Sequence, residues 1–307
     1  MPTGTGGKNP FWQSSVFGLK TSIPPLAKLA ENDMQTPAAT VCFLGPPHSY
    51  SHLATGLYYG DDYRSQPASS IAEVFDRVAA GDCRWGVVPI ENSTDGRIVD
   101  TMSRLIHAKV QIAGEVRLAI HHCLLAQTPE GIVEIQSKPQ ALSQCRNFLA
   151  EHYRDVVQTA VCSTAAAAAA AAADCHVAAV ASRRAGEAAG LSIIAENIED
   201  NANNVTRFVV IGTETSRRTG DDKTSLLFQV AHQPGSLADA MMVFKTHGLN
   251  LTFIESFPSP GQPDEYQFFV ELDGHRDDTP VQSAVDDLRR ITHRMVVLGS
   301  YAKWRSR

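Results

Sequence analysis

Blocks of apolar and polar residues alternate along the chain from about residue 40 and predict an alternation of strands and helices. Residues 41–44 and 85–90 are short apolar runs typical of buried strands, while residues 71–80 carry apolar side chains at the spacing of one helical face. Further helices are predicted at 49–57, 96–108, 138–152, in the alanine run that follows Ser163, and from Ser182 to Gly190. Further strands are predicted at 115–126, 177–181, 191–195 and 207–211. This alternation is typical of an α/β fold, in which ligands bind at strand ends or between lobes.

The pattern changes after a polar, glycine-containing linker at residues 213–222. The elements predicted beyond it are a strand at 223–230, a helix at 236–247, strands at 249–257 and 265–272, a helix at 279–292 and a strand at 295–301. The order β-α-β-β-α-β is that of a ferredoxin-like domain. Many unrelated functions use this arrangement, so it indicates a second domain rather than an activity.

The first 38 residues are rich in Gly, Pro, Ser, Thr and Asn and have no sustained period. We therefore expect a flexible leader at 1–38, with at most a short helix around 26–31. An α/β domain at 39–213 and a ferredoxin-like domain at 222–303 should follow it.

Composition and charge exclude several classes of function. The 307 residues carry a formal net charge of -6, which gives no support to a nucleic-acid or anionic-membrane partner. No stretch approaches the roughly 20 apolar residues that span a bilayer, and the N-terminus lacks the apolar core of a secretory signal. We expect a cytoplasmic protein.

The cysteines and histidines give no sign of a metal or disulfide framework. Six cysteines are scattered without a C-x-x-C pair, so we expect buried, reduced thiols. His121 and His122 are consecutive on a predicted strand and point to opposite faces, so they are poorly placed to hold one ion together. No metal site is predicted.

Four ordered motifs between residues 41 and 211 resemble the signatures of prephenate dehydratases. They are Phe43-Leu44-Gly45-Pro46-Pro47-His48-Ser49-Tyr50-Ser51-His52, then Gly86-Val87-Val88-Pro89-Ile90-Glu91-Asn92-Ser93, then Lys138-Pro139-Gln140-Ala141-Leu142, and Asp200 through Asn204-Val205-Thr206-Arg207-Phe208. The C-terminal region resembles the ACT domain that usually follows, through Gly235-Ser236-Leu237 and Glu255-Ser256-Phe257-Pro258. The resemblance covers nearly everything except the leader.

Three positions depart from the family pattern. The family more often has Gly at the position of His48 and His at the position of Lys138, and its usual Glu-Ser-Arg-Pro becomes Glu-Ser-Phe-Pro through Phe257. The last change removes a guanidinium from the regulatory motif. The leader is also too short for the chorismate mutase domain that many relatives carry, so a monofunctional enzyme is expected.

The resemblance implies a two-lobed catalytic region with a fold like that of periplasmic binding proteins, followed by the βαββαβ ACT domain. It implies decarboxylating dehydration of prephenate to phenylpyruvate in phenylalanine biosynthesis, without a metal or organic cofactor. An amino-acid effector, L-phenylalanine, is expected at the ACT domain. Because ACT sheets pair across subunits, a homodimer or homotetramer is expected.

The fourth motif supplies the predicted catalytic group. We expect Thr206 to hydrogen-bond the departing ring hydroxyl, in a role of positioning and charge stabilisation, because a threonine hydroxyl is a very poor proton donor. The alternative is a β-branched residue that only opens a strand. Arg207 is predicted to clamp a carboxylate through its bidentate fork, and Phe208 to pack on the substrate ring or within the core.

The remaining predicted substrate residues lie where strands give way to helices. Asn92, Ser93 and Thr94 follow a strand, where backbone N–H groups and short hydroxyls form an anion site, although a simple helix cap is the alternative. Ser49 is likewise either a substrate ligand or the N-cap of a helix. Gln140 is either a ligand or a helix-end residue. Glu91 receives no catalytic role, because a carboxylate in an anion site is electrostatically awkward.

In the ACT domain the predicted effector residues are Gly235, Ser236, Leu237, Glu255, Ser256, Phe257 and Pro258. A glycine turn permits close approach of the backbone to an amino acid, and a purely structural dimerisation module is the alternative.

Three other interpretations compete with the dehydratase. Arogenate, the transaminated relative of prephenate, is an open alternative substrate. A catalytically silent amino-acid-binding protein is disfavoured by Thr206 beside Arg207. A transcriptional regulator would need a basic helix-turn-helix, and the sequence shows none.

Overall fold

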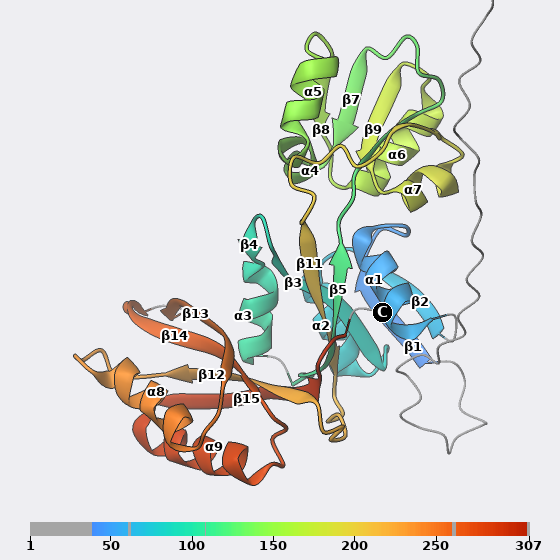
Figure 1. Cartoon of the computed structure of the whole chain (residues 1–307). Helices are drawn as coiled ribbons and strands as arrows, with labels where there is room; N and C mark the ends of the chain where they lie inside the picture. The colour runs from blue at the N-terminus through green and yellow to red at the C-terminus, as the bar shows by residue number, and fades with distance from the viewer. Residues whose placement is uncertain (1–38, 61–62, 108, 260–261, 306–307) are drawn as a thin grey trace, which may run out of the picture.

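The computed structural model describes residues 39–60, 63–107, 109–259 and 262–305, and the expected leader with its short helix lies outside this range. Figure 1 shows three bodies: two α/β lobes joined by long strands, and a C-terminal sheet with two helices. The predicted α/β region with two lobes, followed by a ferredoxin-like domain, is confirmed. None of the helices in this range is long and apolar enough to cross a membrane.

The first lobe is built on a mixed sheet of order β2-β1-β3-β11-β5, with β4 paired to β3. Its strands are β1 (Ala39–Leu44), β2 (Tyr63–Ala68), β3 (Trp85–Asn92), β4 (Gly96–Arg97), β5 (Gln111–Ala119) and β11 (Val205–Gly212). Its helices are α1 (Tyr50–Tyr59), α2 (Ile71–Ala80) and α3 (Val99–His107). Apolar residues of α2 and α3 pack on one face of the sheet and those of α1 on the other, so the strands are buried on both faces.

The second lobe is a five-stranded sheet of order β10-β6-β9-β7-β8. Its strands are β6 (Cys123–Ala126), β7 (Glu134–Ser137), β8 (Val157–Ala160), β9 (Val177–Ala181) and β10 (Ser192–Ala195), and its helices are α4 (Pro139–Gln144), α5 (Arg146–His152), α6 (Thr164–Ala173) and α7 (Arg183–Ala189). The alanine run forms α6 as predicted, with Ser163 capping it through the Ala166 N–H at 3.0 Å. The chain enters this lobe after β5 and returns through β11, so two crossings join the lobes (Figure 1).

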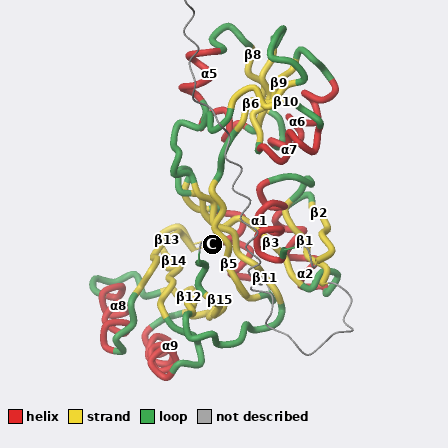
Figure 2. Tube along the Cα trace, turned by 45° about the vertical axis from the view of Figure 1, so that its right-hand side comes forward, coloured by secondary structure: helices red, strands yellow, loops and turns green. Residues whose placement is uncertain are grey.

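The C-terminal domain has the predicted β-α-β-β-α-β order. Its elements are β12 (Asp222–Gln229), α8 (Ser236–Thr246), β13 (Leu251–Ser259), β14 (Gln262–Asp273), α9 (Thr279–Ile291) and β15 (Arg294–Ala302), and the antiparallel sheet has the order β13-β14-β12-β15. Figure 2 shows α8 and α9 together on one side of this sheet. At the junction with the first lobe, a Cβ added at Gly299 would lie 2.1 Å from the Ile112 carbonyl oxygen, so only glycine permits this approach of β15 to β5.

Several predicted elements need correction. Residues 115–126 form two strands in different sheets, because the chain crosses between the lobes after β5. The helix at 138–152 is divided at Cys145, and the helix expected from 96 begins at Val99 because Gly96 and Arg97 pair with β3. The strands β2, β7 and β8 were missed, and β2 and β8 have the largely exposed, polar pattern of edge strands.

The prediction of reduced, buried thiols is wrong for four of the six cysteines. Cys42 in β1 and Cys83 before β3 form a disulfide, with their Cα atoms 6.0 Å apart. The parallel pairing of β1 with β3 brings them together across a sequence separation of 41, which spacing alone does not reveal. Cys162 and Cys175 are free and exposed, whereas Cys123 and Cys145 are free and buried.

Candidate active site between the lobes

A cavity of about 1090 Å³ lies between the two lobes. The first lobe contributes the loop that joins β1 to α1, the end of β3 and the start of β11. The second lobe contributes the start of α4 and one side of α6. The predicted catalytic residue Thr206 lines this cavity together with four predicted substrate residues, Ser49, Asn92, Gln140 and Phe208.

The charge of the lining favours an anion. Lys138 is the one lysine or arginine among the described lining residues, and none of them is an aspartate or glutamate. The rest of the wall is built from hydroxyls, amides, histidine rings and small apolar side chains, with several alanines of α6. A ligand with more than one carboxylate therefore meets net positive charge without a competing acid.

Thr206 is held in a defined orientation by its neighbour Asn92, and both are buried. The Asn92 Nδ2 group donates to Thr206 Oγ1 at 2.8 Å and to Asn204 Oδ1 at 2.9 Å. Asn92 Oδ1 in turn accepts from the backbone N–H groups of Thr94 and Asp95, at 2.9 and 3.1 Å. Because Thr206 Oγ1 accepts from Asn92, its own proton is free to be donated to another acceptor, and Thr206 lines the cavity.

Ser49 both caps α1 and lines the cavity. Its hydroxyl donates to the Leu44 carbonyl oxygen at 3.0 Å and accepts from the His52 N–H at 3.4 Å. The capping alternative that its sequence position suggested is therefore observed, although the residue also lines the cavity. The preceding His48 has φ of 65°, where the family more often has glycine, and its backbone N–H donates to His52 Nδ1 at 3.0 Å.

Side-chain amides join the lobes beside the cavity. Asp95 in the first lobe accepts from Gln144 Nε2 at 2.7 Å and also from Gln140 Nε2. Gln144 Oε1 accepts from Asn204 Nδ2 at 3.0 Å, which connects α4 to the Asn92 network. Gln140 therefore has a structural bond in addition to its place on the cavity wall.

Ser93 and Thr94, predicted as substrate ligands, do not line the cavity. Ser93 Oγ accepts from the Val205 N–H at 2.9 Å and thereby ties the end of β3 to the start of β11. The Thr94 N–H is occupied by Asn92. Both residues belong to the turn that orients Asn92.

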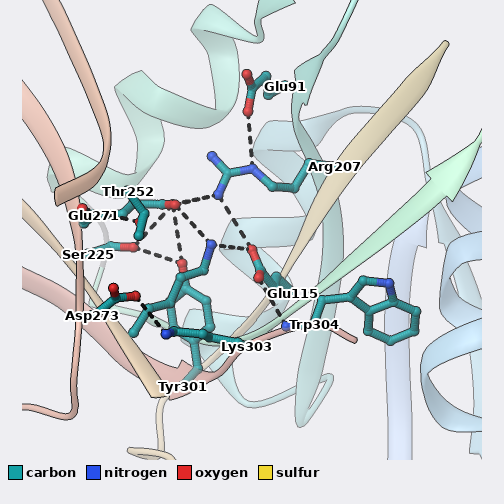
Figure 3. A network of polar contacts seen from close by, with 11 residues as sticks. Glu91, Glu115, Arg207, Ser225, Thr252, Glu271, Asp273, Tyr301, Lys303 and Trp304 are labelled. Carbon is teal, nitrogen blue, oxygen red and sulfur yellow. Dashed lines mark hydrogen bonds and ion pairs between the residues drawn. The ribbon is translucent and has the colours of Figure 1, made fainter. Parts of the chain in front are cut away.

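Arg207 is turned away from the cavity, which removes the predicted carboxylate clamp. Neighbouring strand residues point to opposite faces, so Thr206 and Phe208 face the cavity while Arg207 faces the ACT domain. Figure 3 shows its guanidinium among carboxylates, with Nη1 at 2.6 and 2.7 Å from the two oxygens of Glu271. Its Nε lies 3.2 Å from Glu91 Oε2.

Sequence reasoning missed several lining residues. The first turn of α6, from its cap at Ser163 to Ala166, lies on the cavity wall, and a helix N-terminus attracts anions. The strong cap before the alanine run is the available signal in the sequence, although a cap by itself indicates only the start of a helix. Tyr50 lies within the first motif and His122 in the histidine pair, but neither was assigned to the cavity, whose wall they reach from different lobes.

Tyr50 and His122 are hydrogen-bonded between Tyr50 Oη and His122 Nδ1 at 2.9 Å, and His122 Nε2 lies 3.0 Å from Gln144 Oε1. Burial raises the pKa of Tyr50 well above its ordinary value and lowers the pKa of His122. His121 points elsewhere, with Nδ1 2.7 Å from Glu199 Oε1. Within the described ranges, no group of three His, Cys, Asp or Glu side chains is placed to hold a metal ion.

The predicted effector residues form two segments of the ACT domain. Gly235, with φ of 91°, precedes α8, which begins with Ser236 and Leu237. Residues 255–258 lie in β13, an edge strand. Over the described chain, no hydrogen bond or ion pair joins the two segments to each other.

Arg97 of the first lobe contacts the β13 segment. Its Nη1 lies 2.6 Å from Glu255 Oε1 and 2.9 Å from the Ser256 carbonyl oxygen. Its guanidinium also stands over the Phe257 ring, 5.8 Å from the centroid. A guanidinium from the catalytic region therefore reaches the motif in which Phe257 stands in place of arginine.

Comparisons with known proteins agree with this architecture. The family models for prephenate dehydratase and for the ACT domain match residues 41–216 and 224–290. A bifunctional chorismate mutase/prephenate dehydratase of Stutzerimonas stutzeri is 39% identical over 266 residues, which are 86% of this chain and 73% of that protein.

Two solved structures are similar over most of their length. A prephenate dehydratase of Arthrobacter aurescens in complex with L-Phe is 31% identical with a TM-score of 0.79, over 86% of this chain and 90% of that one. GqqA, described as a novel type of quorum quenching acylase, is 30% identical with a TM-score of 0.76, over 86% and 98%. The two family models match in order, the four motifs resemble those of the family, and Thr206 lines a cavity between the two lobes. The chain belongs to the prephenate dehydratase family and carries an ACT domain.

Proposed function

We propose that the cavity between the lobes binds prephenate and converts it to phenylpyruvate, carbon dioxide and water. The observation that carries this proposal is the lining itself: one positive side chain, no acidic side chain among the described residues, and Thr206 oriented by Asn92. Prephenate has two carboxylates, and one of them leaves as the ring becomes aromatic. Such a substrate needs an anion-binding site with a hydrogen-bond donor at the departing hydroxyl.

Thr206 is the donor that this geometry offers to the hydroxyl. Its oxygen accepts from Asn92 Nδ2, so its proton is available to an oxygen in the cavity. The hydroxyl leaves as water and therefore takes up one proton. Because threonine is a very poor acid, we assign Thr206 the stabilisation of the departing oxygen.

The second lobe supplies the positive field for the carboxylates. Lys138 is the N-cap residue of α4, and the first turn of α6 lines the same cavity. Phe208, on the same face of β11 as Thr206, offers an apolar surface for the ring. Arg207 has no part in this recognition.

The test is a turnover assay with purified protein. Prephenate should yield phenylpyruvate and carbon dioxide in equal amounts, without added metal or cofactor. Arogenate, assayed beside it, should yield phenylalanine more slowly if prephenate is the preferred substrate. Turnover of neither compound would contradict the proposal and favour a silent binding protein.

The similarity to a quorum quenching acylase raises acyl-amide hydrolysis as a second candidate. Acyl transfer needs a nucleophile activated by an adjacent base. Among the described lining residues, no serine, threonine or cysteine side chain is hydrogen-bonded to a histidine ring. The geometry therefore favours the dehydratase, and an acyl-amide substrate serves as the control in the same assay.

We further infer that the ACT domain binds L-phenylalanine and inhibits turnover. Support comes from the similar dehydratase that was solved with L-Phe and from the glycine turn at Gly235, where a Cβ would meet no atom within 4 Å. Calorimetric titration with phenylalanine, with tyrosine as the control, tests binding directly. Heat from tyrosine alone would contradict the assignment.

An edge strand of the ACT sheet that can pair with a second copy of the chain supports a homodimer or homotetramer. Of its two edge strands, β15 lies against β5 of the first lobe, while β13 carries the exposed Ile254. We infer that β13 pairs with a second copy. A monomeric mass in solution at assay concentration would contradict this inference.

A further inference from the structure

A buried group of four charged side chains lies where the dehydratase sheet meets the ACT sheet, and no step of the proposed reaction uses it (Figure 3). Arg207 from β11 and Glu115 from β5 meet Lys223 from β12 and Glu271 from β14. Their side chains are only 6%, 3%, 5% and 2% exposed. Two positive and two negative charges therefore balance each other away from solvent, at the junction of the two domains.

Glu271 is the centre of this group. Its two oxygens accept from Arg207 Nη1 at 2.6 and 2.7 Å, and its Oε2 also accepts from Lys223 Nζ at 2.9 Å. Tyr301 Oη donates to Oε1 at 3.3 Å. Burial alone would raise the pKa of Glu271, but Arg207 and Lys223 outweigh it and hold that pKa below its ordinary value. The carboxylate is therefore charged at neutral pH and binds the guanidinium firmly.

Arg207 transmits this contact to the active site because it directly follows Thr206 in β11. The neighbouring strand β3 bulges at this point: Arg207 pairs with Glu91 and Phe208 with Pro89, so Ile90 of β3 is the extra residue. β11 itself keeps regular register with β5 here, because Thr206 pairs with Leu118 and Arg207 with Arg117. Adjacent residues of a regular strand share one backbone, so the contacts that hold Arg207 on one face help to set the position of Thr206 on the other. On the opposite face, Thr206 must remain within hydrogen-bond distance of Asn92.

We propose that Glu271 of the ACT domain is a positioning residue for the dehydratase site. Glu271 holds Arg207 and thereby keeps Thr206 in hydrogen-bond contact with Asn92. This inference rests on the proposed function of Thr206. It makes the ACT domain part of the catalytic structure in addition to its expected regulatory role. A displacement of β14 would then move Thr206 through one shared side-chain contact.

The first test compares Glu271→Gln with the wild type in the full chain. A misplacement of about 1 Å can cost up to roughly a hundredfold in rate, so we expect kcat to fall at least about tenfold while KM changes by less than about threefold. Arg276→Ala is the matched control. It removes another contact between the domains, to Gln111 at 3.4 Å, at the far end of β5, and should leave kcat within about twofold.

A double variant separates positioning from stability. Arg207→Met with Glu271→Met removes one charge of each sign and leaves Lys223 and Glu115 paired at 2.6 Å, so the buried group stays neutral and the chain should fold. If Glu271 acts only through stability, this folded variant regains wild-type kcat, and that result would overturn the proposal. If it positions Thr206, kcat remains at least about tenfold low.

A crystal structure of the double variant gives a readout that does not depend on turnover. The distance from Thr206 Oγ1 to Asn92 Nδ2, 2.8 Å in the wild type, should exceed hydrogen-bond range. Retention of that distance would overturn the proposal even if the wild type did not act on prephenate. Absence of wild-type turnover would instead contradict the proposed function.

Discussion

Lys138 is one residue of the second lobe on which the substrate affinity should depend. Among the described residues that line the cavity, it is the one lysine or arginine, and it lies at the start of α4. Lys138→Gln should raise KM for prephenate about tenfold, which corresponds to about 1.4 kcal/mol of binding free energy, and should change kcat little. Steady-state kinetics at two salt concentrations measure this, since added salt should weaken the wild type more than the variant.

Lys138→Arg is the matched control, because it keeps the charge and should keep most of the affinity. An unchanged KM in Lys138→Gln would show that the N-terminus of α6 and the hydroxyls bind the carboxylates without this lysine.

His122 should make the stability of the protein depend on pH. Burial lowers its pKa in the folded state, so the unfolded chain takes up a proton first as pH falls. The unfolding free energy should therefore decrease from about pH 6.5 downward, until the pH passes the lowered folded pKa. One pKa unit of lowering corresponds to about 1.4 kcal/mol.

Urea unfolding between pH 7.5 and 5 measures this effect. His122→Gln should make the curve less steep over that window, because the variant lacks the proton that His122 takes up there, while His52, whose pKa burial also lowers, keeps its contribution. Glu199, whose pKa is also lowered, loses its contribution at more acid pH and so falls outside the window. An equally steep curve in His122→Gln would contradict the assignment.

The sequence motifs identified five of the residues that line the cavity but wrongly placed Arg207 among them. Motif resemblance put Thr206, Arg207 and Phe208 together in the substrate site, whereas the two-residue period of a strand separates them onto opposite faces. The same period was applied to His121 and His122, but both lie in the connection between β5 and β6 and not in a strand. Ser93 and Thr94 were misplaced for a related reason: a turn that shapes a site has the same composition as one that binds a ligand.

Helices and strands with one apolar face were predicted well, and elements without an apolar face were predicted poorly. The helix at residues 71–80 has the predicted bounds, because its four buried residues follow the helical period. The edge strands β2 and β8 are largely polar and exposed, so no alternation identified them. The division of residues 115–126 between two lobes depends on tertiary structure that a local pattern does not contain.

The hairpin of β3 and β4 connects the residues that we propose to bind the effector with the candidate active site. Arg97 in β4 holds Glu255 and Ser256 of β13, while its neighbour Gly96 pairs with Asn92. Arg97→Ala should therefore reduce inhibition by phenylalanine by at least about fivefold, with a smaller change in uninhibited kcat. Inhibition curves with and without the substitution measure this.

Arg104→Ala is the control for Arg97→Ala. It removes an exposed ion pair with Asp76 elsewhere in the first lobe and should leave the inhibition constant unchanged. Equal inhibition of Arg97→Ala and wild type would exclude the hairpin as the connection.

At the scale of the whole molecule, the buried charges should make the two domains unfold together. Glu115→Gln leaves two buried positive charges with one buried carboxylate, and removing one partner of a buried pair typically costs about 3–5 kcal/mol. Chemical unfolding should show this loss in a single transition, detected both by tryptophan fluorescence and by circular dichroism.

Asp286→Ala provides the comparison for Glu115→Gln, because it breaks an exposed pair with Arg289 and should cost under about 1 kcal/mol. Similar losses in the two variants would show that the interdomain charges contribute no more than a surface pair.

The overall architecture followed from sequence because two levels of pattern agreed. Strand and helix alternation indicated the α/β region and the ferredoxin-like domain, and the four motifs indicated the family, which both family models confirm. The contacts between the two domains could not be predicted from the sequence. Glu115, Lys223 and Glu271 are ordinary charged residues in the sequence, and only the folded chain shows that they form one buried group with Arg207.

The most direct test of the account is the turnover of prephenate by the wild type, Thr206→Ala and Thr206→Ser. If Thr206 stabilises the departing hydroxyl, kcat should fall at least about a hundredfold in the alanine variant, with KM nearly unchanged, and the serine variant should recover a large part of it. Circular dichroism confirms that each variant is folded. A folded Thr206→Ala variant with wild-type kcat would contradict the central claim.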